Sequence, residues 1–186
     1  MTPENIQLLL DRQHRCFASG ATLPVKNRIA ALKMLRQMLL HNEQRIVRAL
    51  HSDLGKSQEE SYMCEIGMAV SEISYLLRHI RKFAKKQFVP TPLAQFPARS
   101  YQMPVPYGTV LIMSPWNYPL LLTIGPLADA LAAGNTAIIK PSAYSPATAQ
   151  LIKDLIESTF PKEVVAVITG GREENALLLE QKFDYK

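Results

Sequence analysis

Cysteine and long apolar runs are both scarce in this sequence, and each scarcity excludes a class of protein. The 186 residues contain two cysteines, Cys16 and Cys64, which is too few for a disulfide-rich secreted scaffold. No apolar run approaches the roughly 20 residues needed to cross a bilayer. The first ten residues contain Glu4 and no basic group, unlike a signal peptide. We therefore expect a cytoplasmic protein that has no membrane partner.

Common nucleotide and metal motifs are also missing. The glycines of the second half, at 108, 125, 134, 170 and 171, do not form the Gly-x-Gly-x-x-Gly dinucleotide fingerprint. Gly55-Lys56-Ser57 looks like the end of a phosphate-binding loop, but Leu50 stands where that motif needs its first glycine. No two histidines have the i, i+4 spacing of a helical metal site. We expect no bound metal.

Positive charge is concentrated in the first half. Residues 1–90 hold 14 of the 21 Lys and Arg residues but 8 of the 16 Asp and Glu residues. No aromatic interleaving or DNA-binding motif accompanies this charge. We expect a solvated helix face or a subunit contact, and no nucleic-acid partner. The basic cluster comprises Arg78, Arg81, Lys82, Lys85 and Lys86.

Residues 1–86 are predicted to be helical. Helices are expected over 3–18 and about 60–86, and one apolar stripe at helical spacing runs from Val25 to Leu50. Gly55 follows as a helix stop. Met34, Met38, Met63 and Met68 are predicted to fill the core. Residues 87–106 contain five prolines, which predicts an extended linker with a short strand near 99–103.

Residues 107–186 alternate strands with helices. Strands are predicted at 109–113, 137–139 and 164–168, and helices at 120–133, 146–158 and 173–181, with Ser145 as the N-cap of the second helix. Strands joined by helical crossovers form a parallel, doubly wound sheet. The fold class is therefore α/β: N-terminal helices followed by a partial Rossmann-like parallel sheet.

Two segments that follow predicted strands could carry chemistry, because ligands of open α/β sheets bind at the carboxyl ends of the strands. In the segment 113–119, Asn117 has two amide donors that could stabilise an oxyanion, although an asparagine capping the next helix would look the same. Lys140 ends the second strand and could donate to a sugar hydroxyl or a phosphate. An ordinary solvated lysine is the alternative.

Four motifs together resemble a known family. The chain resembles the aldehyde dehydrogenase superfamily, most of all its class 3-like branch, over essentially its whole length. The matching motifs are D-L-G-K-S at 53–57, S-P-W-N-Y-P-L at 114–120, G-P-L-A-D-A-L-A-A-G-N-T at 125–136 and I-I-K-P-S at 138–142.

The resemblance implies roles for particular residues. Asn117 would form the oxyanion hole, and Lys140 would bond the adenosine ribose of NAD or NADP. The other residues that would line the cofactor site are Met113, Ser114, Pro115, Trp116, Ser142 and Gly171. Ala143 stands where the family often has a ribose-binding glutamate, so NADP could be tolerated.

The resemblance further implies oxidation of a small-molecule aldehyde to a carboxylic acid by a thiolate and a general-base glutamate. Neither Cys16 nor Cys64 lies at the matching position, so we expect a truncated chain that is inactive alone. A non-catalytic nucleotide-binding or protein-interaction module is the alternative. An unpaired sheet edge and exposed apolar surface would favour self-association.

Overall fold

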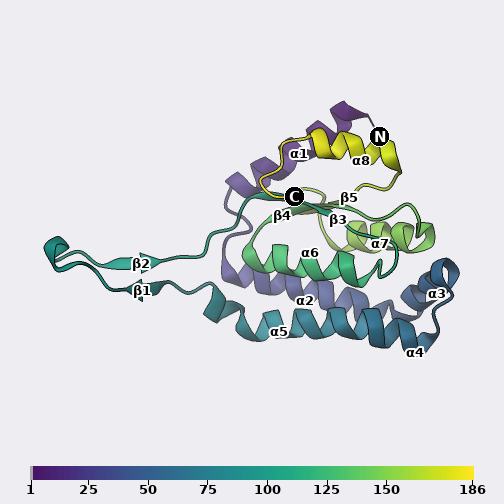
Figure 1. The fold of residues 1–186 in the computed structure, drawn as a ribbon, viewed down its shortest axis with the longest axis horizontal. Coiled ribbons are helices and arrows are strands. Elements are labelled where there is room, and N and C mark those ends of the chain that lie inside the picture. Colours follow the sequence, from purple (N-terminus) through teal and green to yellow (C-terminus); the bar gives the residue numbers. More distant parts are fainter. Residues whose placement is uncertain (1) are drawn as a thin grey trace.

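The structure is a computed structural model that describes residues 2–186. Its first part is helical: α1 (Pro3–Ala18), α2 (Val25–His41), α3 (Glu43–Leu54), α4 (Gln58–Ser61), a π-helical segment η1 (Tyr62–Ile66) and α5 (Gly67–Phe83). Helices α2 and α5 pack lengthwise against α6 (Leu121–Ala133) (Figure 1). Among the described residues, no helix is long and apolar enough to cross a bilayer.

The apolar stripe that begins at Val25 belongs to two helices rather than one. The break is at Asn42, whose side chain donates to the Met38 carbonyl at 2.9 Å. Such a side-chain bond competes with the helical backbone ladder. The prediction for the methionines also needs correction. Met38 is buried, but Met34, Met63 and Met68 are exposed because they lie off the buried faces of their helical segments.

The second part contains a three-stranded parallel sheet in the order β3 (Thr109–Met113), β4 (Thr136–Lys140), β5 (Val165–Val167). Helix α6 joins β3 to β4, and α7 (Pro146–Thr159) joins β4 to β5. Helix α8 (Arg172–Glu180) follows β5. This arrangement confirms the predicted fold class.

Helices cover both faces of the sheet (Figure 1). On one face, Leu111 and Ile138 pack with Ile6 and Leu10 of α1 and with Leu178 of α8. The alternate strand residues point the other way, as the two-residue period of a strand requires. They join one large core that also contains residues of α2, α3, α5, α6 and α7. The predicted helical and α/β parts therefore share a core.

A two-stranded antiparallel hairpin extends away from the body (Figure 1). It consists of β1 (Gln87–Val89) and β2 (Ser100–Gln102), with a short 3-10 turn η2 (Leu93–Gln95) between them. The hairpin occupies the segment predicted as an extended linker. Its two short strands can pair because the prolines of the segment all fall outside them. Its apolar side chains face solvent, with Phe88 73% exposed and Leu93 89% exposed.

Candidate functional site

The carboxyl ends of β3 and β4 lie beside a reversal in strand order. After β5 the chain passes through α8 and returns to the opposite side of β3, where Tyr185 pairs in parallel with Val110. The Leu111 amide donates to the Tyr185 carbonyl at 2.9 Å. In doubly wound sheets the ligand crevice lies at such a reversal, outside the carboxyl ends of the strands.

A cleft of about 240 Å³ opens at this edge. Five of the eight residues predicted for the site line it, namely Met113, Ser114, Lys140, Ser142 and Gly171. The cleft is also lined by residues to which sequence reasoning assigned no role, namely Pro141, Tyr144, Arg172 and Asn175. Ala143 lines it too, although the sequence did not predict that it contacts the site. The three strand-and-turn segments that contribute these residues are far apart in sequence, and only the sheet brings them together.

Lys140 is the charged group at the base of the cleft. It is 3% exposed, and its ammonium donates to the Pro141 carbonyl at 2.8 Å. Burial lowers the pKa of Lys140, and the nearby Glu174 carboxylate opposes that shift. An ammonium has three donors, so two remain for a ligand. The predicted solvated alternative for Lys140 is wrong, because the side chain lies under the β4–α7 loop.

Asn175 supplies a second polar group. Its side-chain oxygen is buried and accepts no hydrogen bond within residues 2–186. Buried acceptors without a donor are uncommon in folded proteins. A hydroxyl-bearing ligand could supply the missing donor. A nucleotide ribose fits this cleft in that respect, since Lys140 offers donors and Asn175 offers an acceptor.

The N-terminus of α8 is already capped. The Gly171 amide donates to the Glu174 carboxylate at 2.7 Å, and this bond contributes most to lowering the pKa of Glu174. The backbone amide is therefore not available to a phosphate. Arg172 is exposed beside it and is the cationic side chain at the rim of the cleft.

The remaining predicted residues, Pro115, Trp116 and Asn117, lie on the exposed loop between β3 and α6 and do not line the cleft. The two ends of this loop are tied together. Thr123 donates to the Pro119 carbonyl at 2.6 Å, so the 2.6 Å contact between the Ser114 and Thr123 hydroxyls has Ser114 as its donor. The structure thus places Asn117 on a braced loop; its oxyanion role stays a prediction.

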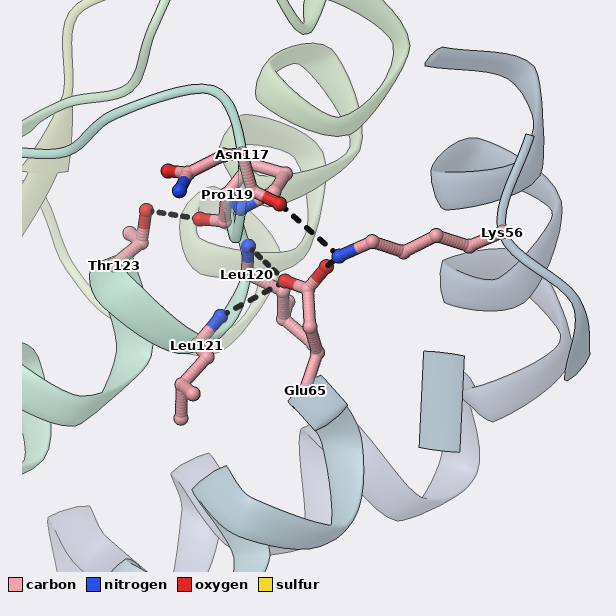
Figure 2. Close-up of polar contacts among 7 residues, drawn as sticks. All are labelled: Lys56, Glu65, Asn117, Pro119, Leu120, Leu121 and Thr123. Atoms are coloured by element: carbon pink, nitrogen blue, oxygen red, sulfur yellow. Dashed lines mark hydrogen bonds and ion pairs between the residues drawn. The ribbon is translucent and has the colours of Figure 1, made fainter. Parts of the chain in front are cut away.

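A buried ion pair lies under this loop. The ammonium of Lys56 is 2.5 Å from the Glu65 carboxylate and donates to the Asn117 carbonyl at 3.1 Å (Figure 2). Sequence reasoning missed this pair. The available signal was Glu65 itself. It is a charged residue on the same helical face as Ala69 and Ile73, four and eight positions later, and both of these are buried.

A larger cavity of about 550 Å³ lies along the outer edge of β3. Its lining is mostly apolar and includes Tyr107, Val110, Pro126 and Tyr185. It contains none of the predicted site residues except Met113. We assign the candidate chemistry to the smaller cleft, where buried polar groups converge. Within residues 2–186, no cluster of His, Cys, Asp and Glu could hold a metal ion.

Comparisons with known proteins agree over most of the chain. Residues 1–184 match the family model described as the aldehyde dehydrogenase family. The 4,4'-diaponeurosporen-aldehyde dehydrogenase of Staphylococcus aureus is 43% identical over 91% of this chain and 37% of its own length. Aldehyde dehydrogenase family 3 member B1 of Bos taurus is 41% identical over 95% of this chain and 38% of its own length.

A solved structure described as the substrate-bound state of Staphylococcus aureus AldH superposes with a TM-score of 0.95. It is 41% identical in sequence, and the match covers 97% of this chain and 39% of that one. The chain thus spans less than two fifths of the length of these relatives. On the strength of the family match and these identities, the chain belongs to the aldehyde dehydrogenase family.

Proposed function

We propose that this chain is the part of an NAD(P)-dependent aldehyde dehydrogenase that holds the adenosine end of the cofactor. The reaction of the whole protein would be the oxidation of an aldehyde to a carboxylic acid. The observation that carries the proposal is the cleft at the carboxyl ends of β3 and β4, where the buried Lys140 ammonium has donors to spare. The family generally uses NAD(P), which supports this choice of ligand.

Each residue of the proposed site has a distinct task. Lys140 donates to ribose hydroxyls, and Asn175 accepts from one of them. Ser142 and Gly171 shape the adenosine side of the cleft, and Met113 and Ser114 line the side toward the nicotinamide. Pro115 and Trp116, on the loop that follows, contact the nicotinamide end beyond the cleft. The bound cofactor supplies the hydride acceptor. Asn117 donates its amide protons to the oxyanion that develops at the aldehyde oxygen, a contribution typically worth about 3 kcal/mol.

We further propose that these 186 residues do not oxidise aldehydes by themselves. Aldehyde oxidation of this kind needs an activated thiolate. Cys16 and Cys64 lie in α1 and η1, and neither lines the cleft. Burial and the Glu163 charge raise the pKa of the Cys16 thiol, which disfavours its thiolate. Formation of NAD(P)H from an aldehyde by the purified chain would contradict this proposal.

Cofactor binding is the direct test. Calorimetric titration with NAD⁺ and NADP⁺ should show saturable binding to the wild-type chain. Lys140→Met removes a charge-assisted hydrogen bond, which is worth about 1.5–3 kcal/mol, and should weaken binding at least about tenfold. Lys153→Met, the same substitution on α7 outside the cleft, is the matched control and should leave the affinity unchanged. Equal affinities of all three proteins would refute the proposed site.

We also propose that the chain self-associates through the β1–β2 hairpin. The hairpin projects from the body and exposes Phe88, Leu93 and Phe96, each more than 70% accessible to solvent. Exposed apolar side chains gathered on one arm are typical of a contact with another protein surface. Two copies exchanging such arms would bury these side chains symmetrically. If the chain were instead a protein-interaction module that binds no nucleotide, it would self-associate but show no saturable binding of NAD⁺ or NADP⁺ in the calorimetric titration.

A further inference from the structure

The buried pair of Lys56 and Glu65 contacts the second half of the loop that carries Asn117 and the start of α6. Lys56 donates to the Asn117 carbonyl at 3.1 Å, and its ammonium lies 4.2 Å from the centre of the Tyr118 ring. The second carboxylate oxygen of Glu65 accepts from the Leu120 amide at 2.8 Å and the Leu121 amide at 3.2 Å. The two side chains therefore contact four of the five residues from 117 to 121.

Glu65 reaches this position from an unusual element. It lies in the π-helical segment η1, between α4 and α5, and its side chain is 0% exposed. Turns of π-helix are rare and are found frequently at functional sites. The segment directs Glu65 at the first backbone amides of α6, which have no partner within their own helix. Figure 2 shows Lys56 arriving from the opposite side of the same carboxylate.

The attraction between the two charges is by itself a weak explanation for such a pair. Removing two charges from water is costly, and apolar residues of similar size often replace a buried ion pair with no loss of stability. A pair that instead has to fix a geometry cannot be replaced in this way. Here the geometry concerns the peptide group of Asn117. Figure 2 shows its side-chain amide pointing away from Lys56 and Glu65 while its carbonyl is held by Lys56.

We propose that Lys56 and Glu65 are positioning residues that clamp the Asn117 loop so that the amide of Asn117 keeps one orientation. The oxyanion role of that amide rests on the proposed function, whereas the clamp itself is a property of the loop. Lys56 fixes the carbonyl of Asn117, Glu65 fixes the start of α6, and the Ser114–Thr123–Pro119 bonds fix the remaining flank.

Trp116 provides a reporter for the clamp, because it is the one tryptophan of the chain and precedes Asn117. In protein labelled with 5-fluorotryptophan, the wild-type chain should give a single sharp ¹⁹F resonance. The Leu120 and Leu121 amides should also be protected from hydrogen exchange. Several or exchange-broadened resonances in the wild type, or unprotected amides, would overturn the proposal without any variant.

The variant to compare is Lys56→Met combined with Glu65→Leu, because it removes both charges, keeps the volume and leaves no unpaired ion. It should fold, broaden or split the ¹⁹F resonance, and speed exchange of the Leu120 and Leu121 amides at least about tenfold. Lys162→Met, which breaks the exposed Lys162–Glu157 pair, is the control and should change neither signal. A folded double variant with the wild-type spectrum and exchange rates would overturn the proposal.

The two proposals fail separately. If the wild-type chain binds no NAD(P) but the double variant loses the single ¹⁹F resonance, the proposed function is refuted and the clamp stands. If the chain binds NAD(P) and the double variant keeps the wild-type spectrum, the clamp alone is refuted.

Discussion

Lys140 combines burial with a positive charge, and this makes cofactor binding dependent on pH. Burial lowers its pKa, so the ammonium loses its proton below the usual lysine value of about 10.4. As pH rises through the lowered pKa, the charge-assisted donors to the ribose are lost and NAD(P) affinity should fall. Affinity of Lys140→Met should not show this alkaline decline. Parallel alkaline declines in both proteins would assign the dependence to another group.

The same pKa shift affects folding with the opposite sign. Between the lowered pKa and the unfolded value, the unfolded chain binds more protons than the folded chain, so stability rises with pH there. The buried charge of Lys140 thus lowers the free energy of unfolding at neutral pH. A buried charge kept at such a cost is more typical of a functional site than of a structural one.

Ala143 bears on the choice between NAD and NADP. It is exposed and lines the same cleft as Lys140 and Arg172. Ala143→Glu would add an acceptor for a ribose hydroxyl and repel a 2′-phosphate, so the NAD-to-NADP affinity ratio should rise at least about tenfold. Ala176→Glu, an exposed site on α8 outside the lining, should not change the ratio. Unchanged ratios in both variants would contradict this assignment.

Part of the site could be predicted from residues alone. Lys140, Ser142 and Met113 end or follow recognisable strands, so their convergence at the sheet edge follows from topology. Arg172 and Asn175 carry no such signal, because their place depends on how α8 docks. The Lys56–Glu65 pair depends on contacts with residues 55 or more positions later, which no local pattern reveals.

At the scale of elements, α7 shows how a distant residue can replace a local cap. Ser145 occupies the N-cap position of α7, as predicted, yet its hydroxyl is buried without a hydrogen bond in the described structure and does not cap the helix. Asp53 accepts instead from the Ala147 amide at 3.1 Å and from the Thr148 amide at 2.7 Å. A carboxylate at a helix N-terminus also interacts favourably with the helix dipole.

Substitutions at these two positions should therefore differ. Asp53→Ala should lower the free energy of unfolding by about 1–2 kcal/mol, because it leaves two amides unpaired. Ser145→Ala should change it by less than about 0.5 kcal/mol, since the hydroxyl makes no bond that is lost. Urea unfolding of the two variants measures both values. A larger loss for Ser145→Ala than for Asp53→Ala would reverse the assignment of the cap.

The helices also show what periodicity can and cannot predict. The extent of α1 matches the prediction because Pro3 and Ser19 mark its ends. The break at Asn42 was missed because the apolar stripe continues through it from α2 into α3. The π-helical segment η1 was missed because the apolar residues from its last position onward keep ordinary α-helical spacing, so no irregularity appears in the sequence: Ile66, Val70, Ile73, Leu77 and Ile80.

At the scale of the molecule, the body has a shared core while the hairpin stands apart from it (Figure 1). If the hairpin mediates self-association, light scattering of the wild-type chain should report a mass above 20.9 kDa. Phe88→Ser with Phe96→Ser should return the mass to that of one chain. Leu8→Ser, at an exposed position on α1, should not. A monodisperse wild-type monomer would contradict this part of the proposal.

The α/β class of the whole molecule was predictable because strands and helices alternate after residue 107. The return of the chain to the outer side of β3 was not, since the parallel contact of Tyr185 with Val110 involves a single pair of residues. That contact nevertheless locates the strand-order reversal and with it the cleft. The global position of the site therefore depends on a pairing that no sequence pattern indicates.

Mapping the bound cofactor by NMR tests the central claim most directly. NAD⁺ added to ¹⁵N-labelled chain should shift the amides of Ser114, Ser142, Ala143, Gly171 and Asn175 together, with one saturation curve. Amides along the outer edge of β3, such as Val110 and Tyr185, should stay unchanged. Saturable shifts confined to that outer edge, or no shifts at all, would contradict the account.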